Sequence, residues 1–78
     1  MKTRYEYLVF EKAAQQPPKT SAWECKNIHS GTVLGEVKWY SGWRQYCYFP
    51  IIQAIYSAGC LRDIDNFMGQ LKAGGGDK

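Results

Sequence analysis

The residues with the clearest chemical potential are cations and tyrosines that alternate along the central part of the chain. Lysine and arginine neutralise phosphates, and aromatic rings stack on nucleic-acid bases. Tyrosine and arginine are also enriched at the hot spots of protein interfaces. The set consists of Lys26, Lys38, Tyr40, Arg44, Tyr46 and Tyr48. If they share one surface, they predict a site that binds nucleic acid or another protein chain.

Glutamates in the same stretches weaken the phosphate-binding interpretation. Glu24 and Glu36 alternate with Lys26 and Lys38, and cross-strand ion pairs would neutralise both lysines. Three interpretations therefore stay open: an ordinary solvated sheet face, a nucleic-acid site, or a protein-binding surface. Homodimerisation is the simplest partner hypothesis, because Leu34 and the tyrosines would expose considerable apolar area.

Thiols and the imidazole indicate neither a metal site nor an enzyme. The three cysteines, Cys25, Cys47 and Cys60, contain no C-x-x-C pair, and the one histidine, His29, falls in a predicted turn. The odd count argues against a disulfide framework, and the spacing against zinc. No phosphate loop, dinucleotide fingerprint or nucleophile elbow is present. We therefore expect no metal, no cofactor and no catalytic residue.

The first third of the chain predicts a strand and a loop. RYEYLVFEK (4–12) is rich in aromatic and branched residues and has no breaker, which favours a strand. AAQQPPKTS (13–21) contains Pro17 and Pro18, which prevent regular pairing. It is therefore an exposed loop, and loops of this length are mobile or functional.

AWECKNI (22–28) and TVLGEVKWY (32–40) predict a hairpin closed by a three-residue loop, with Gly31 in the left-handed conformation. The resulting pairs include Ile28 with Thr32 and Trp23 with Val37. A two-residue loop would split the apolar side chains across both faces of the sheet, which a half-buried sheet resists. The longer loop gathers on one face Trp23, Cys25, Val33, Gly35, Val37 and Trp39.

Tyr40-Ser41-Gly42 repeats this turn signal and predicts a second hairpin with WRQYCYF (43–49). A three-residue loop, as in the first hairpin, pairs Trp39 with Trp43, Val37 with Gln45, and Gly35 with Cys47. Cys25, Gly35 and Cys47 then form one row under the helix. Trp43, Cys47 and Phe49 face the core, whereas the open face receives Arg44, Tyr46 and Tyr48. A two-residue turn would bring Arg44 inward and Trp43 outward.

A C-terminal helix completes the pattern. Pro50 ends the last strand, and IIQAIYS (51–57) is a connector or a brief extra strand. From Ser57, a predicted N-cap, residues 58–72 carry one apolar stripe at helical spacing. The stripe comprises Cys60, Leu61, Ile64, Phe67, Met68 and Leu71. AGGGDK (73–78) ends the helix and is expected to be disordered.

The elements predict an α+β fold of the order β-β-β-β-α. It consists of an antiparallel sheet of three to four strands with one C-terminal helix packed on one face. The 78 residues form a single domain, 1–78, and its opposite sheet face stays open to solvent.

Charge and hydropathy restrict the partners. Ten Lys and Arg against seven Asp and Glu give a net charge of +3, which permits a polyanionic partner without requiring one. No apolar run approaches the roughly 20 residues of a membrane helix, and the N-terminus lacks the apolar core of a signal peptide. We expect a cytoplasmic protein with no membrane partner.

The block LGEVKWYSGWRQYCYFP, followed by SAGCLRDIDNFM, resembles a family of short uncharacterised proteins from bacteria, phages and other mobile elements. The resemblance covers about residues 23–71. It implies an intracellular accessory protein of a mobile element, and it transfers no catalytic or binding residue. The element order is also similar to sheet-and-helix DNA-binding domains of plant transcription factors and integrase arm-binding domains, which lay a sheet in the major groove.

Together these observations predict a small non-enzymatic binding module that contacts nucleic acid through its open sheet face. The alternative is a protein-interaction or homodimerising accessory protein of a mobile element.

Overall fold

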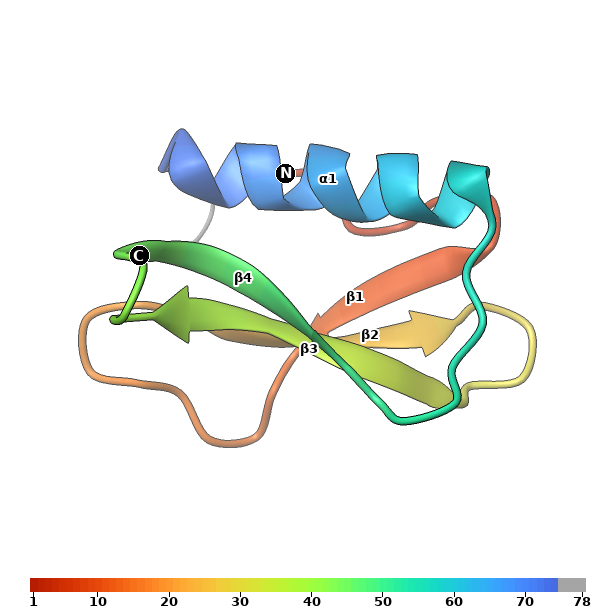
Figure 1. The fold of residues 1–78 in the computed structure, drawn as a ribbon, viewed down its shortest axis with the longest axis horizontal. Helices are drawn as coiled ribbons and strands as arrows, with labels where there is room; N and C mark the ends of the chain where they lie inside the picture. The colour runs from red at the N-terminus through yellow and green to blue at the C-terminus, as the bar shows by residue number, and fades with distance from the viewer. Residues whose placement is uncertain (75–78) are drawn as a thin grey trace.

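A computed structural model describes residues 1–74, which form a four-stranded antiparallel sheet with one helix across one face (Figure 1). The strands lie in the order β1-β2-β3-β4. The elements are β1 (Leu8–Lys12), β2 (Ala22–Asn27), β3 (Val33–Tyr40), β4 (Gln45–Pro50) and α1 (Ala58–Lys72). This confirms the predicted α+β fold and the order β-β-β-β-α.

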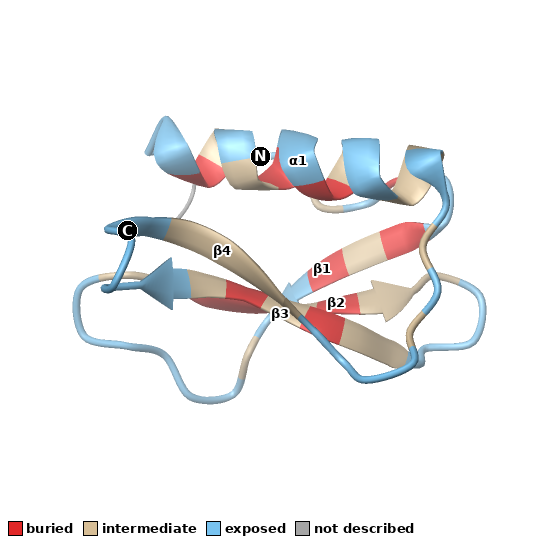
Figure 2. Cartoon of the chain, in the orientation of Figure 1, coloured by how far each residue is buried: buried red, intermediate tan, exposed pale blue. Residues whose placement is uncertain are grey.

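The core lies between α1 and the inner face of the sheet, where the buried residues of both layers meet (Figure 2). The Phe67 ring of α1 stacks on Phe10 at 4.1 Å and meets the edge of Trp23 at 5.2 Å. Ile64 and Leu71 complete the buried face of the helix. Leu61, which was predicted to belong to this stripe, is 54 % exposed. It lies at the edge of the helix face whose centre is formed by the buried residues Ile64, Phe67 and Leu71.

Both ends of α1 have local caps. The Ser57 hydroxyl accepts a hydrogen bond from the Cys60 N–H at 3.1 Å, as predicted for the N-cap. At the other end, the N–H groups of Ala73 and Gly74 donate to the carbonyls of Gly69 and Leu71. These two residues therefore form the helix end instead of the predicted disordered segment. Residues 75–78 of that segment lie outside the described residues.

The predicted strand 4–12 is shorter in the structure, because the chain folds back before it. The Tyr5 N–H donates to the Leu8 carbonyl at 2.8 Å, and the Phe10 N–H donates to the Thr3 carbonyl at 2.8 Å. This turn buries Tyr5, whose hydroxyl donates to Asn66 of α1 at 2.7 Å. The N-terminal segment thus covers the outer edge of β1.

The β2–β3 register is as predicted through Trp23–Val37 and Cys25–Gly35 and then shifts, so that Lys26 pairs with Val33. Leu34 is the extra residue of this bulge and packs against the core instead of the open face.

The predicted Ile28–Thr32 pair is wrong because the Asn27 side chain reorganises the turn. Its carbonyl oxygen accepts from the N–H groups of His29 and Ser30, and the Asn27 N–H donates to the Thr32 carbonyl. Gly31 has the predicted left-handed conformation, with φ of +77°.

The β3–β4 register differs from both alternatives considered from the sequence. Gly35 pairs with Pro50, Val37 with Tyr48, and Trp39 with Tyr46, a shift of three residues from the main prediction. Residues 41–44 form a longer loop in which the Trp43 N–H donates to the Tyr40 carbonyl, and Arg44 is left-handed with φ of +54°. Because a shift by an odd number exchanges the two faces of a strand, Tyr46 and Tyr48 turn toward the helix. Cys47 and Phe49 turn to the open face.

The connector 51–57 contains a turn and no strand. The Ala54 N–H donates to the Ile51 carbonyl at 3.2 Å, and Gln53 is left-handed with φ of +72°. Ile52 and Ile55 project from this segment and are 87 % and 90 % exposed.

Candidate functional site

The predicted site residues are divided between the two faces of the sheet. Tyr48 lies on the inner face, where its hydroxyl is 2.7 Å from that of Tyr56, and Tyr56 donates to the Leu34 carbonyl. Since Tyr56 has one hydroxyl proton, Tyr48 is the donor in the pair. Burial, followed by the contact with Tyr56, raises the pKa of the Tyr48 phenol. The predicted place of Tyr48 on the open face is therefore wrong.

Tyr46 also has a structural position on the inner face. Its hydroxyl accepts from the Ser21 N–H at 3.2 Å, and its ring meets Trp39 edge-on at 5.5 Å. The Ser21 hydroxyl in turn accepts from the Trp23 indole N–H at 2.8 Å. Tyr46 thus fastens β4 to the start of β2, and the predicted open-face position is wrong for it as well.

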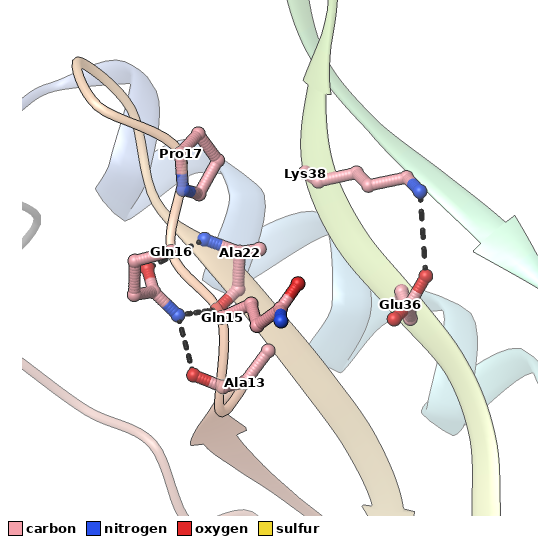
Figure 3. A pocket seen from close by; sticks show the side chains of 7 residues that line it. All are labelled: Ala13, Gln15, Gln16, Pro17, Ala22, Glu36 and Lys38. Carbon is pink, nitrogen blue, oxygen red and sulfur yellow. Dashed lines mark hydrogen bonds and ion pairs between the residues drawn. The ribbon is translucent and has the colours of Figure 1, made fainter.

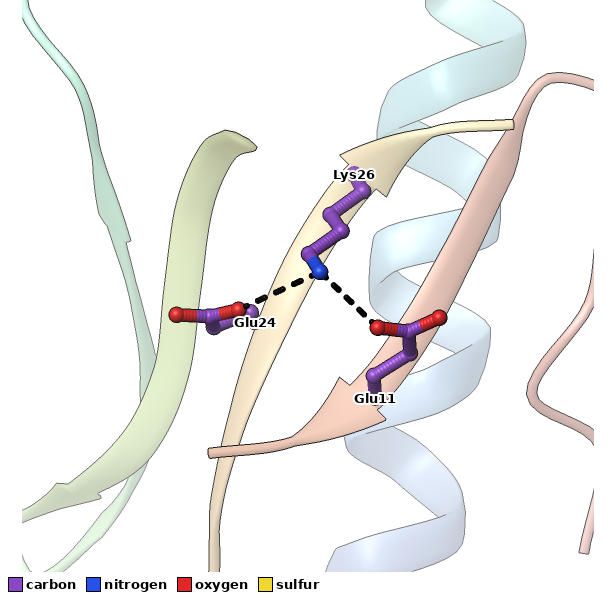
Figure 4. A network of polar contacts seen from close by, with 3 residues as sticks. All are labelled: Glu11, Glu24 and Lys26. Carbon is purple, nitrogen blue, oxygen red and sulfur yellow. Dashed lines mark hydrogen bonds and ion pairs between the residues drawn. The ribbon is translucent and has the colours of Figure 1, made fainter. Parts of the chain in front are cut away.

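Lys26 lies on the open face, as predicted, but it is held in a network with two carboxylates (Figure 4). Its Nζ is 2.9 Å from Glu11 and 3.6 Å from Glu24. The hydrogen bond and charge of Glu11 raise the pKa of Lys26. Glu11 and Glu24 are directly opposite each other on β1 and β2, so the lysine offsets the repulsion between two like charges.

Lys38 is the corresponding cation on β3, with its Nζ 3.5 Å from Glu36. Glu36 lies opposite Glu24, which extends the row of carboxylates across three strands. We call Glu11, Glu24 and Glu36 the acidic row. Its three carboxylates and the two lysines leave a net charge of −1 on this part of the face. Phosphate binding here would have to break ion pairs that already exist.

Three rings form a continuous strip beside Lys38, over β3, β4 and the loop between them. Tyr40 meets Trp43 at 5.5 Å and Phe49 at 6.1 Å, both edge-on. The Lys38 ammonium lies 4.8 Å from the centroid of the Phe49 ring. We call Tyr40, Trp43 and Phe49 the aromatic strip. Trp43 is 68 % exposed and Tyr40 is 42 % exposed, so the strip is accessible to a partner.

Arg44 occupies the exposed loop at the end of this strip rather than a strand position. Of the six predicted residues, the structure therefore brings Lys26, Lys38 and Tyr40 to the open sheet face and places Arg44 at its rim.

A shallow cavity of about 480 Å³ lies next to Lys38, between β3 and the loop that follows β1 (Figure 3). It is lined by Ala13, Gln15, Gln16, Pro17, Ala22, Glu36 and Lys38. The Gln16 amide donates to the carbonyls of Ala13 and Ala22 and accepts from the Ala22 N–H. The Gln16 side chain thus hydrogen-bonds to backbone groups at both ends of the exposed loop and holds this part of the loop in place.

Gln15 has a different role in the same loop. Figure 3 shows its amide directed toward the β3 side of the cavity. Within residues 1–74 no hydrogen bond involves this amide, so its donors and its acceptor are available to a ligand.

Of the three cysteines, Cys25 and Cys60 contact the core, whereas Cys47 lies on the open face, opposite Lys38. Cys25 is completely buried and burial raises its pKa to about 11, which keeps the thiol protonated and unreactive at neutral pH. Cys47 lies on the opposite face of the sheet, so the predicted row of Cys25, Gly35 and Cys47 is wrong. In the part of the chain that the structure describes, no three His, Cys, Asp or Glu side chains gather as a metal site would need.

The main register predicted from the sequence placed Trp43 and Phe49 toward the core, whereas Trp43 is exposed and Phe49 lies half-buried on the open face. The exposure of Ile52 and Ile55 in the connector was not predicted. A usable signal existed for the connector, since Ile52 and Ile55 follow a strand-ending proline and precede the helix stripe. For Phe49, residues 46–49 gave no signal because both of their faces are aromatic or apolar, but Gln45 did, since the main register directed this polar side chain toward the core.

Among residues 1–74, no helix has the length and apolar character to cross a membrane. Comparisons with protein-family models, with curated proteins and with solved structures found no match to this chain. The resemblance to mobile-element proteins therefore stays a prediction from the sequence.

Proposed function

We propose that this chain is a small non-enzymatic protein-interaction module that docks a segment of another protein on its open sheet face. The observation that carries this proposal is the exposure of Trp43 and Tyr40 beside an acidic row whose lysines are ion-paired. Tryptophan and tyrosine are typical hot-spot residues, and exposed apolar clusters on small domains commonly mark contact sites.

A protein partner suits this face better than nucleic acid, which the sequence had favoured. Single-strand binding needs rings on which successive bases stack and cations for the phosphates. Tyr46 and Tyr48 contact the inner layer, and Lys26 and Lys38 contact carboxylates. Arg44 alone among the six predicted residues has both a positive charge and a place in an exposed loop.

A selection from a random peptide library tests the proposal and needs no assumption about the sequence of the partner. Phage-displayed peptides would be panned on the wild-type chain and on the Trp43→Ala and Tyr40→Ala variants. We expect peptides that bind the wild type and lose binding to both variants. Tyr7→Ala is the matched control, because Tyr7 is 47 % exposed and precedes β1, at the opposite edge of the sheet from β4.

Circular dichroism must show that each variant is folded. Failure to enrich any peptide, or equal binding by wild type and Trp43→Ala, would contradict the proposal. A parallel titration with labelled single- and double-stranded DNA and RNA at two salt concentrations examines the other function. Tight binding that weakens steeply with salt would replace our proposal with nucleic-acid binding.

A further inference from the structure

The rings of the aromatic strip form corners rather than a flat platform. The planes of Tyr40 and Trp43 meet at 82°, and those of Tyr40 and Phe49 at 76°. A flat ligand stacks on one ring face at a time, and successive bases need rings with similar orientation. Two perpendicular rings about 5.5 Å apart instead surround one compact aliphatic group from two sides.

Proline has the shape that such a corner accepts. Proline-rich segments adopt the polyproline II conformation before they bind, and they dock in grooves lined by aromatic side chains. Their ordering cost is low because the unbound segment is already extended. The strip lies on the open face over β3 and β4, where Phe49 is the register partner of Glu36.

The acidic row supplies a second point of recognition at a defined distance. Tyr40 and Glu36 lie on the same face of β3, four residues apart, which corresponds to about 13 Å. A polyproline II segment rises about 3.1 Å per residue and covers this distance in about four residues. Glu36 contacts Lys38 at 3.5 Å through one carboxylate oxygen, but its side chain is 43 % exposed, and a carboxylate has two oxygens that accept hydrogen bonds. Because the acidic row as a whole keeps a net charge of −1, a basic side chain can bind at Glu36 without displacing Lys38.

The cavity beside Lys38 adds hydrogen-bonding groups for the backbone. A polyproline II segment makes no internal hydrogen bonds, so its carbonyls and remaining N–H groups need partners. The Gln15 amide offers both donors and an acceptor on the far wall of the cavity.

We infer that the open face binds an extended, proline-containing segment with a lysine or arginine about four residues from the proline. This inference rests on the proposed function and adds the chemistry of the partner. The proline lies in the corner of Tyr40 and Trp43, and the basic side chain lies at Glu36.

Fluorescence anisotropy with labelled ten-residue peptides tests this inference. Two peptides carry Pro-Pro with an arginine four residues before or after it, because the direction of the segment is not specified by the rings. Each of these two has two control versions, one with alanine in place of the prolines and one with alanine in place of the arginine. We expect one of the first two to bind at least tenfold more tightly than its proline-free version.

Variants of the protein assign each contact. Trp43→Ala should weaken binding at least tenfold, whereas the control Tyr7→Ala should leave it unchanged. Glu36→Gln should weaken binding of the arginine peptide severalfold and leave the arginine-free peptide unaffected. This pairwise comparison separates a direct charge contact from a general effect on the face.

Two results would overturn the inference: equal affinity for the proline and alanine peptides, or binding that ignores Trp43→Ala. The library selection distinguishes this failure from that of the proposed function. Selected peptides that depend on Trp43 but lack proline would refute the inference and leave the function standing. Absence of any selected peptide would remove both.

Discussion

Substituting Gly35 by alanine tests the β3–β4 register, because Tyr48 occupies the space above this glycine. A Cβ at position 35 would lie 2.5 Å from the Tyr48 hydroxyl oxygen and 2.8 Å from the Phe49 carbonyl oxygen. Tyr48 cannot turn away without loss of its hydrogen bond to Tyr56. In the register predicted from the sequence, position 35 would instead face Cys47 and tolerate the methyl group.

The expected loss can be worked out from these contacts. Overpacking in a core costs about 1–3 kcal/mol, and loss of a hydrogen bond costs about 1 kcal/mol more. Replacing glycine inside a strand gains roughly 0.5–1 kcal/mol from the unfolded chain. The net loss for Gly35→Ala is therefore roughly 1–3.5 kcal/mol. For a domain of this size it corresponds to a fall in Tm of roughly 4–28 °C.

Urea and thermal unfolding followed by circular dichroism measure this loss. Gly69→Ala is the matched control, because Gly69 lies in α1 and an added Cβ there meets nothing within 4 Å. It should raise stability by about 0.5–1 kcal/mol. Tyr48→Leu in the Gly35→Ala background should recover part of the loss, since the shorter side chain leaves room for the methyl group. If Gly35→Ala is as stable as the wild type, Tyr48 does not lie over Gly35 and the register is wrong.

Three further predictions concern the connector, the tyrosine pair and the buried thiol. Gln53→Gly should stabilise the chain by about 1 kcal/mol in urea unfolding, because glycine adopts the left-handed φ of +72° without strain; an unchanged midpoint would contradict this. Tyr56→Phe should cost about 1–3 kcal/mol in the same assay, since it removes the partner of Tyr48 and of the Leu34 carbonyl, and a neutral effect would show that the pair contributes nothing. The folded-state pKa of Cys25 is raised from 9.0 to about 11, so its contribution to stability is complete below pH 9 and is lost as the pH rises toward 11. Between pH 8 and pH 10.5 the free energy of unfolding should fall less for Cys25→Ala than for the wild type. An equal fall in both proteins would count against this assignment.

Local sequence signals were sufficient for the elements and for half of the first hairpin. Ser57 and the apolar spacing after it predicted α1 with the bounds Ala58–Lys72, because caps and helical periodicity act within a few residues. The pairing of Trp23 with Val37 followed from the need to gather apolar side chains on one face. The turn at Gly31 took the predicted left-handed conformation.

The tertiary structure alone decided which side chains of β4 form the core and which form the candidate site. Tyr46 and Tyr48 alternate with Cys47 and Phe49, so both faces of the strand can be buried and a pattern of period two does not choose between them. The choice depends on Gly35, which leaves space for the Tyr48 ring, and on Tyr56 of the connector, whose hydroxyl accepts a hydrogen bond from the Tyr48 hydroxyl. These partners are distant in the sequence, so the composition of the open face, including Phe49 beside Lys38, depends on packing that no local pattern encodes.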